Sequence, residues 1–549
     1  MSTSMGGQRT IILKEGTTST QGREAQHADI MAALAIAESI RSSLGPKGMD
    51  KMLVDGFGDV TISNDGATIL DEMEVQHPAA KMMVEVAKTQ DDEVGDGTTS
   101  AVVIAGELLS KAQTLMDKDV HPTVIVDGYQ IASERALEFL RKIAVKVNAN
   151  DRTMLRKVAK VAVASKLLAE HKDFIADLAV KAVLEVAERS GTVYKADIDD
   201  IKVEKKPGGS STDTVLIQGI LLDKEVVHPG MPRRVQNAKI ALLNCPVEVE
   251  KTEFDAKLNV ESPDQMKGFL DEEEKILKEM VDRIASSGAN VVICEKGIDD
   301  AAQHFMAKRN LLAVRRVKQS DMEKLAKATG GVIHTQLEDL KASDLGHAGL
   351  VEERKVSDDK MTFVEDCKNP KALSILVRGG TERVVDEAER AIHDALCVVR
   401  DVVVQPEVVA GGGAAEAEVS RMVRGYAQKL KGKEQLAVLA YAEALETIPL
   451  TLAENAGMDP IDSLMEVRSK HQAKQTWVGI DPYKGKVSDL AKLDVYEPLA
   501  VKVQALKSAG EAAGMILRID DIIAASKSKE GGAPKGPGES AKEEGEGES

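Results

Sequence analysis

The sequence predicts a multidomain α/β protein in which one domain is nested inside another. Its 549 residues are too many for a single core, because a domain typically holds ~150 residues. Helical periodicity fills the chain up to residue 152 and returns after residue 408, while short apolar strands alternate with helices in between, as in α/β domains. We therefore expect the two ends to form one mainly helical domain, joined by hinge strands to the insert.

In the N-terminal part, the predicted helices end at Gly-containing loops. The first helix begins near Gly22 and stops at Gly45-Pro46-Lys47-Gly48, since glycine favours termination and proline prevents continuation. A hairpin is predicted over 52–63, and the turn 64–66 places its aspartate at the start of the next helix. Residues 79–148 are almost wholly helical by period.

The later elements alternate between strands and helices. A buried strand at 374–377 leads to a long helix that Thr381 caps and that runs to Val404. The last strand is predicted at 516–519. In the inserted segment, short apolar strands are expected at 239–243, 291–294, 313–317 and 331–334.

Composition narrows the function classes. The chain carries 72 basic and 90 acidic residues, a net charge of −18, and such a surface repels nucleic acids and anionic lipid. The four cysteines form no C-x-x-C pair, which is typical of free thiols in a reducing compartment. No signal region and no apolar run near the ~20 residues of a membrane span are found. We expect a cytoplasmic protein without nucleic-acid or membrane partners.

One Gly-rich hexapeptide is a candidate phosphate and magnesium site. Gly95-Asp96-Gly97-Thr98-Thr99-Ser100 precedes the apolar run 101–105, which predicts a tight loop entering a buried helix that Thr98 or Thr99 can cap. The first N–H groups of that helix form an anion site. Asp96 beside threonine hydroxyls suits Mg²⁺ that arrives with a nucleotide. An ordinary Gly-rich turn before a capped helix explains the hexapeptide equally well.

Other candidate residues are far apart in the sequence. The Gly-rich run 410–413 enters a helix, either as a flexible joint or as a loop that lets the backbone approach a ligand. Lys166 lies between two helices, where a solvated lysine is the simpler interpretation. If Asp65, Asp96 and Asp394 converge, a cation-bound triphosphate and a base for water share one pocket.

The segment 248–287 contains a strongly predicted helix. Ser262-Pro263-Asp264-Gln265 combines a cap, a first-turn proline and a capping-box glutamine. Apolar residues then recur at helical spacing, interrupted by the glutamates 272–274. The residues alone favour a helix packed on the inserted domain over a protruding helix that contacts clients or neighbouring copies.

Four motifs together carry a family resemblance. Residues 44–50 (LGPKGMD), 64–70 (NDGATIL), 95–100 (GDGTTS) and 410–413 (AGGG) occur in chaperonin order. The chain resembles a group II chaperonin subunit of the archaeal thermosome type over essentially its whole length. The segment around Ser262 falls where these proteins carry a helical protrusion that closes the cavity, and bacterial group I chaperonins lack it. The resemblance therefore favours the protruding helix.

The resemblance implies a nucleotide site with assigned residues. Asp96 would ligate Mg²⁺, and Asp65 and Asp394 would orient or deprotonate the attacking water. Lys166 would sense the γ-phosphate, Gly412 would lie against the nucleoside, and Glu497 would reach the ribose or base. The residues implied to contact the phosphates are Leu44, Gly45, Pro46, Gly97, Thr98, Thr99 and Ser100.

The resemblance also implies an architecture and an activity. The expected protein is an ATP-dependent chaperone that needs ATP and Mg²⁺, in which identical or paralogous subunits form two stacked rings of eight or nine around non-native clients. A Mg-nucleotide-dependent small-molecule phosphotransferase is the alternative, and a structural ring without turnover is a third class. The implied parts are a mainly helical equatorial ATPase domain (1–152 and 408–526), a small α/β intermediate hinge domain (153–221 and 372–407), a nested α/β apical substrate-binding domain (222–371, protrusion about 248–287) and a disordered tail (527–549).

Overall fold

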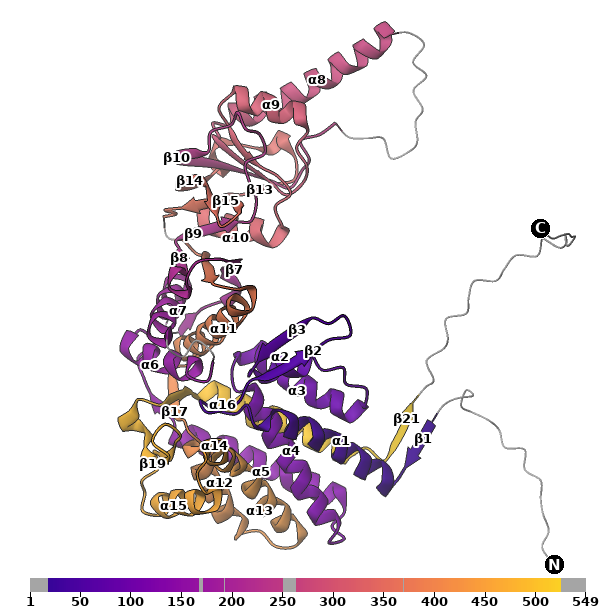
Figure 1. Cartoon of the computed structure of the whole chain (residues 1–549), viewed down its shortest axis with the longest axis vertical. Helices are drawn as coiled ribbons and strands as arrows, with labels where there is room; N and C mark the ends of the chain where they lie inside the picture. Colours follow the sequence, from indigo (N-terminus) through magenta and orange to yellow (C-terminus); the bar gives the residue numbers. More distant parts are fainter. Residues whose placement is uncertain (1–17, 167–170, 192, 250–262, 369, 525–549) are drawn as a thin grey trace, which may run out of the picture.

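The molecule consists of three packed regions arranged along its long axis (Figure 1). This computed structural model describes residues 18–166, 171–191, 193–249, 263–368 and 370–524. Each region has its own buried hydrophobic side chains. The chain runs from the first region through the second to the third and then returns, so that both ends contribute to the first core.

The first region is a helical layer drawn from both ends of the chain. Its core joins buried side chains of residues 30–140 to those of residues 409–517. Helix α4 is central, because all its residues from Ala101 to Ala105 are buried. The helices are α1 (Arg23–Arg41), α2 (Gly66–Asp71), α3 (Pro78–Val94), α4 (Thr98–Met116), α5 (Pro122–Ile143), α12 (Ala414–Ala427), α13 (Lys433–Leu445), α14 (Thr447–Asn455), α15 (Pro460–Gln472) and α16 (Leu499–Leu517).

Short antiparallel strands border this layer. Strands near the two ends of the described chain pair with each other, and a hairpin follows α1. A three-stranded sheet has β17 at its centre. The pairs are β1 (Thr18–Gln21) with β21 (Asp521–Ala524), β2 (Lys51–Val54) with β3 (Val60–Ser63), β17 (Glu407–Ala410) with β4 (Val145–Lys146) and β20 (Tyr496–Pro498), and β18 (Val478–Asp481) with β19 (Lys486–Asp489).

The second region packs three helices against a small sheet. Its core combines side chains of α6 (Arg152–Val163), α7 (Lys172–Val186) and α11 (Glu382–Val404). Thr381 caps α11 by accepting a bond from the Val384 N–H. The sheet has β16 (Leu373–Gly379) between β7 (Ile201–Pro207) and β8 (Val215–Ile217), and β5 (Glu188–Ser190) pairs with β6 (Val193–Lys195).

The third region is a seven-stranded mixed sheet with hydrophobic side chains buried on both faces. Helices α8 (Pro263–Ser286), α9 (Asp300–Lys308) and α10 (Gln319–Thr329) accompany it. The strand order is β12 (Leu312–Val314), β11 (Val291–Cys294), β10 (Arg234–Leu243), β14 (Gly346–Val356), β15 (Asp359–Glu365) and β9 (Gly219–Leu222), with β13 (Ile333–His334) paired to β10.

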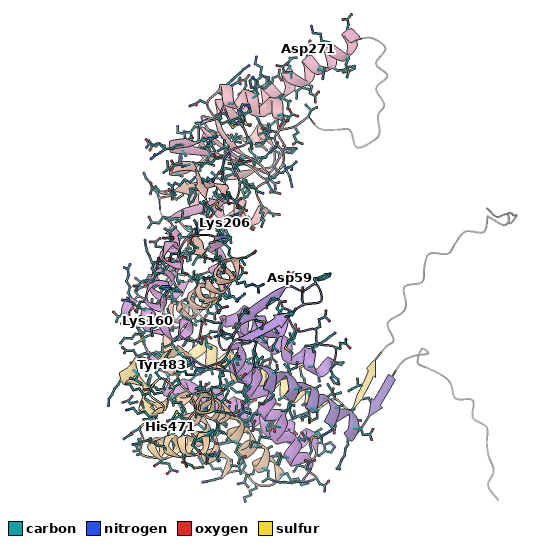
Figure 2. The ribbon with its side chains drawn as sticks, in the orientation of Figure 1. Asp59, Lys160, Lys206, Asp271, His471 and Tyr483 are labelled. Carbon is teal, nitrogen blue, oxygen red and sulfur yellow. The ribbon has the colours of Figure 1, made fainter. Side chains whose placement is uncertain are left out.

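Helix α8 has two different halves. In its C-terminal half, Leu277, Val281 and Ile284 are buried in the third region. The N-terminal half extends away from the sheet, and Asp271 marks it in Figure 2. Phe269 and Leu270 are about half exposed there (50% and 54%). The capping serine at position 262 lies outside the described residues.

Two local predictions were wrong. Thr98 and Thr99 do not cap α4: Gly97 is the N-cap in a left-handed conformation (φ 77°) and no side chain caps the helix. Only glycine enters this conformation without strain, and it turns the chain into the helix. The strand expected at 516–519 was also misplaced, because Ile516 and Leu517 complete the buried face of α16 and β21 begins at Asp521.

One segment is apolar enough to resemble a membrane span. Residues 433–455, covering α13 and α14, have a mean hydropathy of 1.4 over an 18-residue window, of which 78% is buried inside the fold. The prediction that no apolar run comes near the ~20 residues of a membrane span was therefore wrong, because this segment is long and apolar enough. Its burial in the first core is typical of the central helix of a packed domain, which shows the same composition.

Candidate functional site

A cavity of about 540 Å³ lies where the helical layer meets the segment after α6. Lys160 and Tyr483, which line it, lie near each other at one edge of the molecule (Figure 2). Asp394 is the one predicted site residue outside the lining, and it lies directly behind Lys166. The predicted residues that line the cavity are Leu44, Gly45, Pro46, Asp65, Asp96, Gly97, Thr98, Thr99, Ser100, Lys166, Gly412 and Glu497.

The loop between α3 and α4 forms one wall of the cavity. Gly95 ends α3 in a left-handed conformation, and the Gly97 N–H donates to Asp96 Oδ1 over 2.6 Å. A side chain at Gly95 would overlap Cys397 of α11, and one at Gly97 would crowd Val501 of α16. The loop is therefore clamped between two helices, with the free N-terminus of α4 behind it, which is a suitable anion site.

Asp65 accepts hydrogen bonds from three residues. It is the N-cap of α2, where its Oδ2 accepts from the Thr68 N–H over 3.0 Å. Its Oδ1 accepts from the Thr98 hydroxyl and from Lys166 Nζ, both over 3.3 Å. Burial alone would raise the pKa of Asp65, but the Lys166 charge and these hydrogen bonds lower it to about 2. Asp65 therefore stays ionised.

Lys166 and Asp394 form a buried ion pair. Lys166 Nζ lies 2.8 Å from Asp394 Oδ2, and the two residues are 7% and 5% exposed. The interpretation of Lys166 as a solvated lysine is thus wrong. Burial lowers the pKa of Lys166, but the adjacent carboxylates outweigh it and raise that pKa, so the lysine is charged. Burial raises the pKa of Asp394 well above its usual range, although Lys166 opposes this shift. A raised pKa suits a proton acceptor.

The chemistry of the loop fits one magnesium ion delivered with a nucleotide. Within the described residues, no three His, Cys, Asp or Glu side chains form a cluster that could hold a metal alone. Mg²⁺ commonly takes one or two carboxylates and completes its shell with phosphate oxygens and water. Burial raises the pKa of Asp96, so a cation would offset the cost of its charge. Asp96 would supply the carboxylate ligand, and the Thr98 and Thr99 hydroxyls line the same cavity.

A second buried cluster lines the same cavity, and of its residues only Glu497 was predicted. Lys502 Nζ lies 2.8 Å from Glu416 Oε1 and also pairs with Glu497 Oε2. Glu416 follows the Gly-rich loop in the first turn of α12, and Lys502 lies in the apolar helix α16. The sequence did carry a signal for this pair, because Glu416 and Lys502 each lie among apolar residues of a helix. Charged residues are rarely buried unless they are paired.

The Gly-rich loop after β17 separates the second cluster from an apolar wall. Gly412 is left-handed (φ 59°) and its carbonyl accepts from the Ile480 N–H over 3.0 Å. A side chain at Gly412 would overlap Leu490, and one at Gly411 would overlap Glu497. The loop therefore lies between the Glu497 carboxylate and the apolar residues Ile480 and Leu490, which also line the cavity.

Comparisons with known proteins match this chain over almost its whole length. A profile of the TCP-1/cpn60 chaperonin family matches residues 36–527. A thermosome subunit of Pyrococcus horikoshii is 58% identical over 535 residues, covering 97% of both chains. A thermosome subunit of Methanopyrus kandleri is 59% identical over 94% of this chain and 95% of its own, and thermosome subunit alpha of Archaeoglobus fulgidus is 56% identical over 96% and 97%.

Proposed function

Since the chain belongs to the TCP-1/cpn60 chaperonin family, we propose that it is an ATP-dependent chaperone subunit of a double ring that encloses non-native proteins. The observation that carries the nucleotide chemistry is the convergence of Asp65, Asp96 and Lys166 at one cavity from three separate segments, with Asp394 of a fourth segment paired to Lys166 directly behind it. Sequence similarity alone does not require these side chains to meet. A phosphotransferase has no support from the comparisons, in which the relatives are thermosome subunits.

The site residues have separable roles in ATP hydrolysis. The N-terminus of α4 and the loop before it would hold the phosphates, and Asp96 would hold the Mg²⁺ that neutralises them. When bound, the ion supplies charge stabilisation to the phosphoryl group in transfer. Asp394, with its raised pKa, accepts a proton from the attacking water, and the ionised Asp65 orients that water. Lys166 positions both carboxylates.

The three regions suggest how hydrolysis is coupled to enclosure. We assign the helical layer (1–152 and 408–526) as the equatorial domain, the second region (153–221 and 372–407) as the intermediate domain and the sheet region (222–371) as the apical domain. Asp394 belongs to the second region, so the site is complete only while α11 is docked on the helical layer. The exposed half of α8 would contribute to closing the chamber. Hydrolysis gated by a domain movement is expected to be slow.

Solution mass measured by light scattering, with and without Mg-ATP, tests the proposal when released phosphate is read from the same sample. The expected result is a particle on the order of a megadalton, which is roughly sixteen to eighteen copies of a 58.9 kDa chain, with slow phosphate release. Assembly without turnover would instead indicate a structural ring. A monomer or dimer, even after candidate paralogous subunits are added, would overturn the proposal.

A further inference from the structure

The loop that follows α1 receives from one side chain a hydrogen bond that its own backbone does not provide. The Leu44 carbonyl accepts from Asn455 Nδ2 over 2.9 Å, and no other described residue donates to it. Leu44 is buried, so an unpaired carbonyl there would be costly. The same Nδ2 donates to the Arg41 carbonyl over 3.2 Å. Asn455 therefore ties both the end of α1 and the loop to α14.

Helix α14 supports this loop and also the Gly-rich loop after β17. A side chain at Gly45 would overlap Leu452, and one at Gly413 would overlap Pro449. Pro449 and Leu452 are three residues apart, so they are neighbours on the helix surface, and Asn455 lies three residues further on. Both loops of the cavity thus rest on one short helix, which Asn455 ends.

Helix α14 is itself held in place at its N-terminal end. Glu446, which precedes the helix, is buried and accepts from Arg468 Nε over 2.8 Å. Glu446 also pairs with Arg424, so the start of α14 is tied to both α15 and α12. The support on which the two loops rest is therefore fixed.

The hydrogen bond to Asn455 sets the direction of the neighbouring N–H group. The Leu44 carbonyl and the Gly45 N–H belong to one planar trans peptide unit, in which the two groups point in opposite directions. The Gly45 N–H therefore points away from Asn455, which does not line the cavity, and it has no acceptor among the described residues. Pro46 has no N–H, so Gly45 supplies the donor at this point of the cavity wall.

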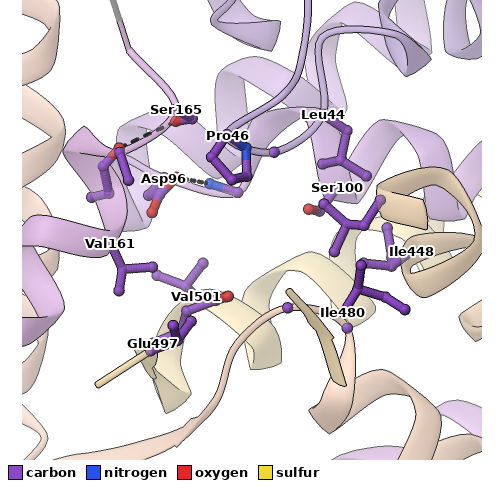
Figure 3. Close-up of a pocket in the computed structure, with 18 of the residues that line it drawn as sticks. Leu44, Pro46, Asp96, Ser100, Val161, Ser165, Ile448, Ile480, Glu497 and Val501 are labelled. Carbon is purple, nitrogen blue, oxygen red and sulfur yellow. Dashed lines mark hydrogen bonds between the residues drawn. The ribbon is translucent and has the colours of Figure 1, made fainter. Parts of the chain in front are cut away.

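Figure 3 shows where this part of the wall lies. Leu44 and Ile448 are on the same side of the cavity, opposite Val161. Ile448 belongs to α14, so the helix reaches the cavity beside the loop that it supports.

Resting on the proposed function, we infer that Asn455 is a positioning residue that aims the Gly45 N–H at the phosphates of the bound nucleotide. A donor that is already oriented loses little freedom when a ligand binds, and a hydrogen bond to a charged phosphate is stronger than one between neutral groups. Without the Asn455 amide, the peptide unit between Leu44 and Gly45 is free to rotate, and binding weakens although Asn455 itself lies outside the cavity.

Calorimetric binding of Mg-ADP to the assembled full-length protein tests this inference with Asn455→Leu. The variant keeps a branched side chain but removes the amide, and it should weaken Mg-ADP binding about tenfold. The KM for ATP should rise by a similar factor while kcat stays within about twofold, because the loop binds the phosphates equally in the ground and transition states. Mg-ADP affinity within about twofold of the wild type would overturn the inference.

Thr451→Val is the matched control, because it removes a hydrogen bond between the same two helices away from the loop. Thr451 Oγ1 accepts from Arg41 Nε over 3.1 Å, and Thr451 does not line the cavity. Thr451→Val should leave Mg-ADP affinity within about twofold of the wild type. Equal losses of affinity in Thr451→Val and Asn455→Leu would show that the contact between the helices, and not the aim of one N–H, is what matters.

Asn455→Asp supplies a rescue, and it replaces Asn455→Leu if that variant does not assemble. The new carboxyl group would face the Leu44 and Arg41 carbonyls, which disfavour its ionised form and raise its pKa. When protonated, it donates a hydrogen bond as the amide does. The Mg-ADP affinity of Asn455→Asp, divided by that of the wild type at the same pH, should therefore rise as the pH falls from about 8 to about 5. A ratio that does not change with pH would contradict the inference.

The outcomes separate this inference from the proposed function. A wild type that does not bind Mg-ADP contradicts the proposed function itself. A wild type that binds Mg-ADP contradicts only the positioning role if Asn455→Leu binds it equally well. If Asn455→Leu increases amide hydrogen exchange in α1 without changing the affinity, Asn455 only caps the end of that helix, and the inference is overturned.

Discussion

Two lysines line one cavity and each pairs with two carboxylates, yet the two clusters are built differently. Lys502 joins Glu416 and Glu497, and all three belong to elements of the helical layer. Lys166 joins Asp65 of the helical layer to Asp394 of α11, whose apolar face belongs to the second core. The Lys502 cluster is part of a single packed region, whereas the Lys166 cluster lies at an interface between two regions.

Arginine hydrogen bonds join α11 to the helical layer around the Lys166 cluster. Three arginines of α11 donate to backbone carbonyls of the helical layer: Arg383 to Val60, Arg390 to Ile62 over 3.4 Å, and Arg400 to Glu93 over 2.7 Å. Hydrated arginines and carbonyls replace such bonds with bonds to water at little net cost. The comparison therefore indicates that the Lys166 cluster can open by movement of α11 while the Lys502 cluster stays closed.

The largest effect is expected from Asp394→Ala, which removes the proposed proton acceptor from the Lys166 cluster. Turnover at saturating Mg-ATP should fall by about 10²–10⁴-fold, while ADP affinity stays within about threefold of the wild type because Asp394 does not line the cavity. Released phosphate and calorimetric binding measure the two quantities. Asp386→Ala is the control, since Asp386 lies on the same helix and pairs with Lys205 instead. Hydrolysis at the wild-type rate in Asp394→Ala would refute the assignment.

A second prediction separates the two clusters by local stability. Lys502→Met leaves two buried carboxylates without their cation inside one core, which lowers the stability of that core by about 3–5 kcal/mol. Amide hydrogen exchange in α12 and α16 should therefore increase by about 10²–10³-fold. Lys166→Met should increase exchange in α11 and leave α16 unchanged, because α11 can undock and hydrate Asp394. Both variants are measured by mass spectrometry on assembled, nucleotide-free protein. Equal exchange of α16 in the two variants would remove the distinction between a fixed and a separable cluster.

The smallest expected effect is a pH dependence of the docking of α11 on the helical layer. Burial raises the pKa of Asp401 on α11 to about 7, although Arg400 opposes the shift and Asp96 adds to it. The docked state therefore binds a proton that the hydrated carboxyl, with a pKa near ~3.9, does not. That stabilisation is complete below pH ~3.9, is lost progressively as the pH rises from ~3.9 to about 7, and does not change further above that pH.

This loss can be measured as amide hydrogen exchange in α11, after correction for the intrinsic pH dependence of the exchange reaction. The opening equilibrium of nucleotide-free protein should rise by up to about tenfold per pH unit between pH 5 and 7 and level off above pH 7. Asp401→Asn should flatten this rise, while exchange in α16 should stay constant in both proteins. A wild-type profile without slope, or an unchanged slope in Asp401→Asn, would show that Asp401 does not control docking.

Most of the architecture and part of the site could be predicted from local patterns. The capping of α2 by Asp65 and of α11 by Thr381 follows from side-chain oxygens at helix starts, and both caps are present. The four motifs correctly identified the chaperonin family. Thr98 was wrongly assigned as a cap, because a positive φ at Gly97 is a property of the folded loop that composition does not distinguish from an ordinary turn.

The sequence by itself determined which residue types stand beside which helix ends, because capping, glycine conformations and helical period act within a few residues. Only the tertiary structure decided that Lys166 is buried between two aspartates and that Glu416 and Glu497 share Lys502. These pairs join segments distant in the chain, so their burial and charge balance arise when the two ends pack into one core and α11 docks on it. Long-range contact leaves no local periodic signal, and for this reason the Lys502 cluster appeared only in the folded molecule.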